Sequence, residues 1–268
     1  MQPKLGKFFL SLAVLLGSLV SLQAAATEYH FGVNAEVSYK ESEAEVARHY
    51  AAFLDELGKV TGDKYIFSAV YSDRVDQAVA SKKYDFLLIH THLALKAEKT
   101  DKYQVVGFTD DRKNDVVYFF VRPDSAVKTL KDISGQTIGV PGLYSWASAT
   151  ARSTLREAVP NAQPNFVATR YQEAVPLMVE FKTAVVGITR SKKLVDDYLK
   201  QKKVRLVHTT QALPLNALIA SPKVSAAQVS EMRAAMATMT QSKAFDSLAF
   251  KALRYSADEH QRLQNFYK

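Results

Sequence analysis

The 268-residue sequence contains no cysteine and only one tryptophan, Trp146. Without thiols, the chain cannot form disulfides, thiolate metal sites or a cysteine nucleophile. For the same reason we expect no lipid anchor on an N-terminal cysteine. After residue 26, no apolar run reaches the roughly 20 residues that span a bilayer. The stability of the fold must therefore come from side-chain packing.

Sequence signatures of common catalytic sites are also lacking. There is neither a Gly-x-Ser-x-Gly nucleophile elbow nor a His-Glu-x-x-His zinc motif. The run Gly139-Val140-Pro141-Gly142 lacks the later Gly or Gly-Lys of a nucleotide-binding loop. The acid pairs Asp110-Asp111 and Asp196-Asp197 lie in polar runs that we expect to be exposed. The sequence therefore predicts a protein that is not an enzyme and uses no cofactor.

The N-terminus has the features of a secretory signal peptide. Lys4 and Lys7 precede an uncharged apolar run, Phe8–Leu22, and three small residues follow at Ala24–Ala26. The alternative is a membrane anchor, but the apolar run of about 15 residues is short for a span. We expect residues 1–26 to be removed, with cleavage after Ala24 or Ala26, and the mature protein to be periplasmic.

The charge of the expected mature chain is modestly positive. The whole sequence carries +8, and residues 1–26 hold two lysines and no acid, which leaves +6. This excess favours anionic ligands. The basic residues are scattered and do not alternate with aromatic residues, so nucleic acid is not an expected partner.

Apolar runs and helical periodicities alternate along the chain, which predicts an α/β fold with mainly parallel sheets. We expect two lobes, formed by residues 27–115 with 213–268 and by residues 116–212, joined by two crossings that create a hinge and a cleft. From Ser225 to Tyr267 we expect mostly helix. The expected strands are Tyr29–Val33, Tyr65–Val70, Phe86–Ile89, Gln104–Phe108, Val116–Val121, Thr137–Val140, Asn165–Ala168, Ala184–Ile188, Val204–His208 and Ala217–Ala220.

Several markers occur in the order and spacing of a known family. They include Phe31-Gly32-Val33, Thr61-Gly62 after an amphipathic helix, and Tyr84–Ile89. The most specific is Leu130–Val140, which reads LKDISGQTIGV. On these residues the chain resembles the phosphonate/phosphite/phosphate-binding periplasmic proteins of ABC transporters. The resemblance implies a two-lobe type II periplasmic-binding fold, a small ligand, an ABC permease as partner, and a monomer.

The turn GVPGLYSWAS, residues 139–148, is the first candidate for ligand contact. The resemblance places a Ser/Thr-rich, anion-holding turn here, and a helix start can present N–H groups to an anion. Ser145 and Ser148 are candidates for holding the anion. The alternative is that one of them serves only as the N-cap of the helix. Trp146 departs from the family pattern. We expect its ring either to stack on the ligand or to belong to the core.

A second candidate segment, His90-Thr91-His92, follows the buried strand Phe86–Ile89. Ligands of open α/β sheets bind beyond the carboxyl ends of strands, so Thr91 and His92 are candidate ligand contacts. The two histidines could also suggest a metal, but no third ligand stands at a fixed spacing. We therefore predict no metal site.

The remaining candidates lie after other strands. Tyr39 follows the first strand, and Tyr118 lies in the strand that crosses between lobes. Tyr171 and Thr183 stand where the family's phosphonate-binding members carry a His and an Asp, which makes an aminoalkyl phosphonate less expected. Thr189 ends a strand and is a further candidate. Arg170 and Arg190 lie near strand ends. They are better placed to contact an anion than Arg152 and Arg156, which share one helix face.

Three functions are compatible with these patterns. The first is capture of an oxyanion of the phosphate, phosphite or phosphonate type for delivery to a permease. The second is sensing, in which the same closure signals to a membrane kinase. The third is binding of an organic molecule without phosphorus. Closure follows from a ligand's preference for the closed form in all three cases, so the sequence does not separate them.

Overall fold

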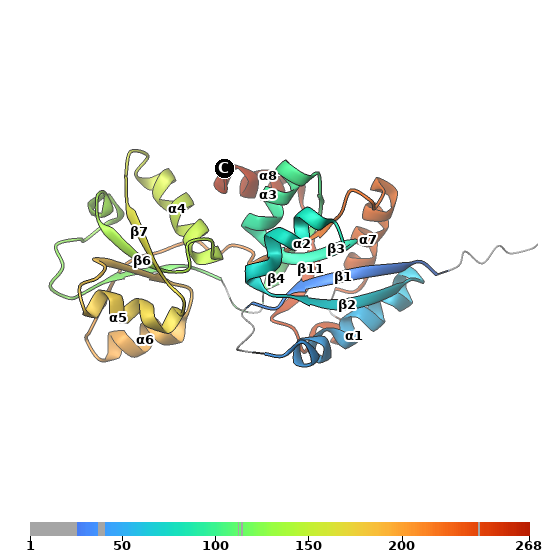
Figure 1. Ribbon diagram of the computed structural model, residues 1–268, viewed down its shortest axis with the longest axis horizontal. Coiled ribbons are helices and arrows are strands. Elements are labelled where there is room, and N and C mark those ends of the chain that lie inside the picture. Colours follow the sequence, from blue (N-terminus) through green and yellow to red (C-terminus); the bar gives the residue numbers. More distant parts are fainter. Residues whose placement is uncertain (1–25, 37–40, 112, 114, 241) are drawn as a thin grey trace, which may run out of the picture.

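The structure is a computed structural model that describes residues 26–36, 41–111, 113, 115–240 and 242–268. It confirms the predicted two-lobe α/β architecture (Figure 1). Its strands are β1 Glu28–Asn34, β2 Lys64–Val70, β3 Phe86–His90, β4 Gln104–Asp111, β5 Tyr118–Val121, β6 Thr137–Pro141, β7 Asn165–Thr169, β8 Val186–Thr189, β9 Arg205–Thr209, β10 Asn216–Ala220 and β11 Phe250–Arg254.

The helices alternate with these strands. The α-helices are α1 Glu43–Thr61, α2 Val75–Ser81, α3 Thr91–Asp101, α4 Trp146–Ala158, α5 Val175–Glu180, α6 Lys192–Lys200, α7 Ala226–Thr238 and α8 Ala257–Phe266. Short 3₁₀ turns are η1 Ser72–Arg74, η2 Leu130–Ile133, η3 Gln172–Ala174 and η4 Lys243–Phe245.

The first lobe is built on a six-stranded sheet in the order β11-β4-β10-β3-β1-β2. Phe31 packs against Phe86 of the sheet at 6.3 Å and against Phe53 of α1 at 6.1 Å between ring centroids, which binds α1 to the sheet. α1 starts with a capping box, in which Ser42 and Glu45 satisfy each other's backbone N–H groups. The sheet and its apolar helix faces therefore hold this lobe together.

The second lobe is built on a five-stranded sheet in the order β7-β6-β8-β5-β9. The sequence places Pro176 within an expected helix, and the structure shows it in the first turn of α5. Proline is tolerated there because the first N–H groups of a helix have no intrahelical partner. η3 precedes α5, which therefore starts late within the helix expected over Tyr171–Phe181, one of the two effects, late start or kink, that Pro176 predicts.

Two expectations about the strands are wrong. The sheets are mixed, because β5 and β10 run antiparallel to their neighbours. These strands enter each sheet from the opposite lobe and so run against the strands that begin within it. The stretch from Ser225 to Tyr267 also contains a strand, β11, which pairs with β4. Its sequence, FKALR, is too short and too charged to stand out within a helical pattern.

Two adjacent chain segments cross between the lobes. Thr210 N–H donates to Val117 O at 3.0 Å, and Val117 N–H donates to the Thr210 hydroxyl at 2.9 Å. Leu213 N–H donates to Asp115 O at 3.0 Å. The two crossing segments are therefore hydrogen-bonded to each other side by side. We retain the predicted lobe boundaries, 27–115 with 213–268 and 116–212, as a proposal.

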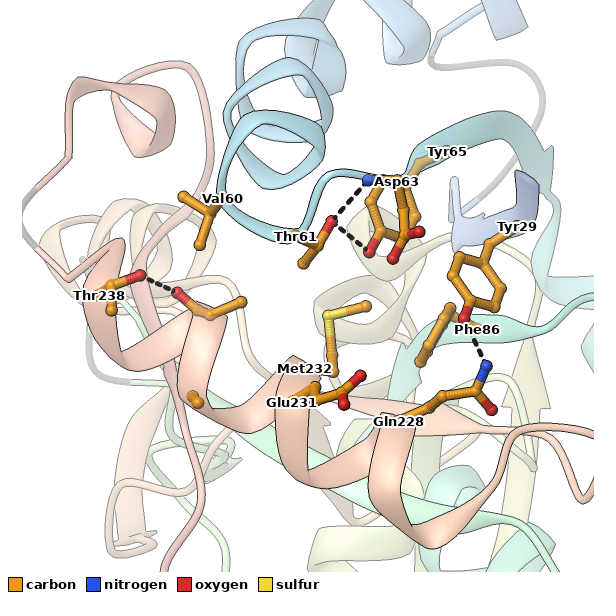
Figure 2. Close-up of a pocket in the computed structure, with 12 residues that line it drawn as sticks. Tyr29, Val60, Thr61, Asp63, Tyr65, Phe86, Gln228, Glu231, Met232 and Thr238 are labelled. Atoms are coloured by element: carbon orange, nitrogen blue, oxygen red, sulfur yellow. Dashed lines mark hydrogen bonds between the residues drawn. The ribbon is translucent and has the colours of Figure 1, made fainter. Parts of the chain in front are cut away.

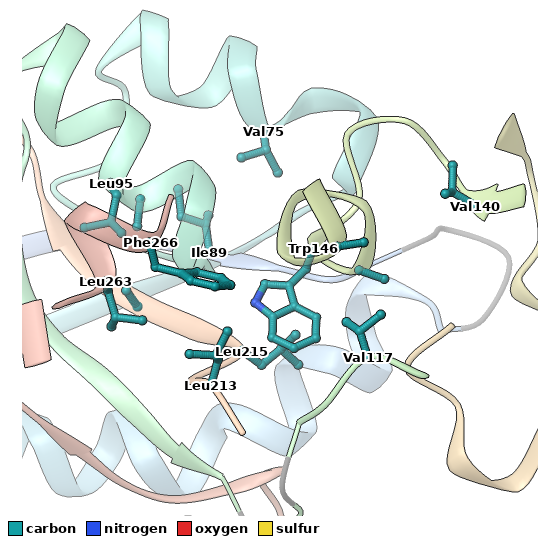
Figure 3. Packing of buried hydrophobic residues seen from close by; sticks show 14 of the residues in the cluster. Val75, Ile89, Leu95, Val117, Val140, Trp146, Leu213, Leu215, Leu263 and Phe266 are labelled. Carbon is teal, nitrogen blue, oxygen red and sulfur yellow. The ribbon is translucent and has the colours of Figure 1, made fainter. Parts of the chain in front are cut away.

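Trp146 is the largest side chain of the apolar cluster that spans both lobes, and it is 1% exposed. It projects from the first turn of α4 toward the crossing segment and α8 of the first lobe, among Leu213, Leu215 and Phe266 (Figure 3). Nearby, the hydroxyls of Thr150 and Tyr267 lie 2.9 Å apart. The start of α4 is therefore anchored to the first lobe.

Asp111 is a titratable residue next to the segments that cross between the lobes. Its Oδ2 accepts from Leu215 N–H at 3.0 Å. Burial raises the pKa of Asp111 from 3.8 to about 7; the Leu215 hydrogen bond opposes this rise and the Asp115 carboxylate adds to it. The folded chain thus holds this proton more tightly than the unfolded chain.

We therefore predict that the free energy of unfolding falls as the pH rises from about 4 to about 7, because ionisation costs more in the folded state. The side chain of Asp111→Asn cannot ionise. Between pH 5 and pH 8, the free energy of unfolding of this variant should therefore fall by about 1–3 kcal/mol less than that of the wild type. Denaturant titrations at both pH values measure this difference. The control is Asp110→Asn, which removes ion pairs to Lys251 and Arg254. Parallel pH profiles for wild type and Asp111→Asn would contradict the prediction.

Candidate functional site

A cavity of about 380 Å³ lies between the two lobes. It opens at the carboxyl ends of β1, β3, β6, β7 and β8, where ligands of open α/β sheets usually bind. The first lobe contributes Asn34, Glu36, Ser72, Asp73, Val75, His90 and Leu93, and the second contributes Pro141 to Ala147, Thr169, Arg170, Gln172 and Arg190.

The predicted turn supplies much of the wall of the second lobe. Gly142 has φ +87°, a conformation that glycine adopts without strain and that turns the chain into α4. Ser145 is the N-cap of α4, and its hydroxyl accepts from Ser148 N–H at 3.2 Å. Ser145 lines the cavity. The start of α4 therefore faces the cleft with its partial positive charge.

Ser148 does not line the cavity. It is fully buried, and its hydroxyl donates to Gly142 O at 2.6 Å. The Ser145 hydroxyl donates in turn to Ser148 Oγ at 3.0 Å. Ser148 therefore holds the turn closed from behind. Trp146 borders the cavity, although most of its surface is covered by the inter-lobe core.

The segment after β3 is arranged differently from the sequence expectation. Thr91 is buried and its hydroxyl donates to Pro214 O at 2.7 Å. His92 Nε2 donates to Tyr144 O at 3.1 Å, and burial lowers the pKa of His92 to about 3, so its ring is neutral. Neither residue lines the cavity, whereas His90 does. Thr91 and His92 thus fix the crossing segment and the turn.

Three other predicted contacts, Thr189, Tyr118 and Tyr171, also lie outside the cavity lining. Thr189 is buried and donates to Gln172 Oε1 at 2.9 Å, which orients a side chain that does line the cavity. Tyr118 pairs with Thr189 in the sheet. Tyr171 is half-exposed beside the Arg170 guanidinium, which lies 5.6 Å from the ring centroid. Tyr39 lies outside the described residues.

Charged groups meet at the floor of the cavity. Arg190 of the second lobe contacts Glu36 of the first lobe at 3.1 Å and Asp115 at 3.5 Å. Glu36 Oε2 lies 3.5 Å from His90 Nε2. Burial raises the pKa of Asp115, and Arg190 opposes this rise. The sequence patterns do not predict Glu36, Asp73 or His90 as cavity residues, because single charged residues in loops have no periodic signal.

Arg170 differs from Arg190. It lies at the cavity wall and makes no ion pair within the described residues. Its guanidinium makes a cation–π contact with the Tyr171 ring. An anion that enters the cleft therefore meets Arg170 without having to displace a carboxylate.

A separate cavity of about 360 Å³ lies at the opposite end of the first lobe's sheet (Figure 2). It is lined by the end of α1, the starts of β1, β2 and β3, and α7. Its polar atoms largely pair with one another: Gln228 donates to the Tyr29 hydroxyl at 2.7 Å, and the hydroxyls of Thr61 and Tyr65 lie 3.1 Å apart. The cleft, where polar groups of two lobes converge, is the stronger candidate.

In the described ranges, no group of three or more His, Cys, Asp or Glu side chains could hold a metal ion. Over the same ranges, every helix is too short or too polar to cross a membrane.

We predict that Ser148→Ala costs about 1–3 kcal/mol of stability, because it removes a buried hydroxyl that donates to Gly142 O at 2.6 Å and leaves that carbonyl only the longer bond from Ser145 N–H at 3.3 Å. The matched variant Ser145→Ala removes the N-cap hydroxyl, which lines the cavity, together with its bond to Ser148 Oγ, and should cost about 1 kcal/mol. Denaturant titration of both variants gives these values. If Ser148→Ala were no less stable than Ser145→Ala, the assignment of Ser148 as the internal brace of the turn would be wrong.

Comparison with known proteins agrees with this architecture. The chain is similar to XAC2383 from Xanthomonas citri in structures bound to chloride and to ATP, with 16% and 14% identity, TM-scores of 0.69 and 0.70, and coverage of 90% of this chain and 96% of that one. A phosphonate transporter's binding protein, PA3383 from Pseudomonas aeruginosa, matches with 16% identity and a TM-score of 0.60, covering 90% and 85%.

A third solved structure is PhnD1 from Prochlorococcus marinus in complex with methylphosphonate, at 12% identity and a TM-score of 0.60, covering 90% of this chain and 97% of that one. At these identities the likeness shows the fold alone. A search of curated proteins by sequence finds no match. Residues 37–261 match the family described as the phosphonate periplasmic substrate-binding proteins of ABC transporters. The chain therefore belongs to this family of periplasmic solute-binding proteins.

Proposed function

We propose that this protein is exported and captures a small ligand with an oxyanion group in its inter-lobe cleft, for delivery to an ABC permease. The observation that carries the proposal is the convergence on one cavity of the start of α4, the Ser145 cap and the Arg170 guanidinium. Helix N-termini and guanidinium groups are the two protein features that best complement oxyanions.

The second lobe supplies the proposed anion contacts. The first N–H groups of α4 have no partner one turn earlier in their own helix, and the anchored Trp146 fixes where they point. Arg170 follows β7 on the same wall of the cavity. An oxyanion placed between them would be held from two directions.

The organic part of the ligand would contact apolar walls. Val75 and Leu93 line the cavity from the first lobe, and Pro141 and Leu143 line it from the second. Tyr144 is 85% exposed at the mouth. An exposed tyrosine next to a cleft is suited to cover a ligand when the lobes approach. These walls also favour the second candidate, an organic anion without phosphorus.

Closure supplies the signal that a ligand is bound. The two crossing segments link the lobes and are hydrogen-bonded to each other, Val117 to Thr210 and Asp115 to Leu213. We propose that the lobes rotate about this short hinge. Contacts made by one ligand to both lobes stabilise the closed form only. A permease can then distinguish the loaded from the empty protein by shape.

The proposed location follows from the N-terminus. Residues 1–26 have the composition of a cleaved signal peptide, and they precede β1. Members of the family are periplasmic. We therefore propose that the mature protein is a periplasmic monomer without a cofactor.

A thermal-shift panel tests the ligand class. Phosphate, phosphite or methylphosphonate at millimolar concentration should raise the melting temperature of the mature protein by mass action. Stabilisation by sulfonates alone would select the candidate without phosphorus. If no anion produced a shift, the oxyanion proposal would be rejected.

The role of Arg170 is tested by substitution. Arg170→Gln should weaken anion binding roughly 5- to 20-fold, because it removes a charge-assisted contact. Arg122→Gln is the control, since Arg122 pairs with Asp124 away from the cavity. Isothermal titration with methylphosphonate measures both affinities. Equal affinities for Arg170→Gln and the wild type would remove Arg170 from the site.

A further inference from the structure

A continuous chain of polar contacts crosses the floor of the cleft. It starts at Asn216, whose Oδ1 lies 2.9 Å from His90 Nδ1. It continues from His90 Nε2 to Glu36 at 3.5 Å, and from Glu36 to Arg190 at 3.1 Å. It ends at Asp115, 3.5 Å from Arg190, where the chain crosses between lobes. Glu36 is the link in this chain that passes from the first lobe to the second.

The backbone holds Glu36 in this position. Its φ is +59°, in the left-handed region that non-glycine residues rarely adopt. Its N–H donates to Asn34 Oδ1 at 3.1 Å, and its carbonyl accepts from Ser72 N–H at 2.8 Å. Strained backbone that persists with such support is commonly found at functional sites. The Glu36 side chain is therefore directed into the cleft by the fold.

A carboxylate and a small oxyanion offer the same chemistry to a guanidinium. Arg190 contacts the carboxylates of Glu36 and Asp115, so its donors already face negative oxygens. A ligand oxyanion can use Arg190 only if one of these carboxylates gives way. Both acids belong to the first lobe, but the Asp115 side chain lies at the crossing and is 16% exposed, whereas the Glu36 side chain is 39% exposed and is the more easily displaced of the two.

We propose that Glu36 is an internal competitor for the anion site, which occupies Arg190 until a ligand displaces it. This inference rests on the proposed function. It makes Glu36 a specificity-determining residue: an anion binds well only if its contacts exceed those that Glu36 makes. It also couples binding to the lobes, because displacement breaks a contact between them.

Asp73 provides a matched comparison within the same cavity. It is also an acid of the first lobe and lines the cavity, but it makes no ion pair with Arg190. Asp73→Asn removes one negative charge from the cleft and leaves the Glu36–Arg190 pair in place. The difference between Asp73→Asn and Glu36→Gln therefore separates competition for Arg190 from a general change in potential.

The test is a double-mutant cycle on binding, with methylphosphonate and inorganic phosphate as probes. Isothermal titration is run on the wild type, Glu36→Gln, Arg190→Gln and the double variant. Glu36→Gln should bind roughly 5- to 20-fold more tightly than the wild type, and Asp73→Asn no more than about 3-fold more tightly. In the Arg190→Gln background, the gain from Glu36→Gln should fall below about 2-fold.

Three outcomes would overturn the inference while the proposed function stood. Glu36→Gln could bind the probes no more tightly than the wild type, Asp73→Asn could show an equal gain, or the gain could persist without Arg190. Binding of neither probe to any variant would overturn the anion function and this inference together. Circular dichroism melts show whether each variant folds. If Glu36→Gln does not fold, Glu36→Asp replaces it; because its side chain is shorter, it should show part of the same gain in affinity.

Discussion

The double crossing of the chain between the lobes is the constraint on which the rest of the structure depends. The segments at Asp115–Val117 and Thr210–Leu213 are joined by backbone hydrogen bonds, so they act as one ribbon. Because the chain enters each sheet from the other lobe, β5 and β10 run antiparallel to the strands beside them. The same arrangement brings the carboxyl ends of strands from both sheets to face each other. The cleft is therefore a consequence of how the chain passes between lobes.

Trp146 and Glu36 stabilise two sides of this geometry by different physical means. Trp146 packs into the inter-lobe core, where burial of a large apolar ring is favourable. Glu36 reaches Arg190 through a half-exposed ion pair, whose net stability is small and easily exchanged for another anion. One contact thus fixes the start of α4, whereas the other can be broken at little cost. A binding protein needs both, because its site must be preformed yet able to close.

Much of the fold could be predicted from the sequence because apolar runs identify buried strands directly. The run Phe86–Ile89 forms β3, which is buried throughout. The charged strand β11 has no such signal, and only its pairing with β4 defines it. Site residues were harder to predict. Ser145 could be placed at a helix start from local chemistry, whereas Ser148, with the same hydroxyl three residues later, points away from the cavity and braces the turn.

The sequence by itself therefore determined the two-lobe α/β architecture, the family and the turn that opens α4, because these depend on local periodicity and on motifs that are contiguous in the chain. Only the tertiary structure decided which polar groups meet in the cleft. Glu36 and Arg190 are 154 residues apart, and their contact arises from two loops on different lobes. The choice between His90 and His92 likewise depended on which ring lines the cavity and which is held by the Tyr144 carbonyl of the turn. Long-range contacts of this kind leave no local pattern, since charge in a loop is compatible with solvent, a partner or a ligand.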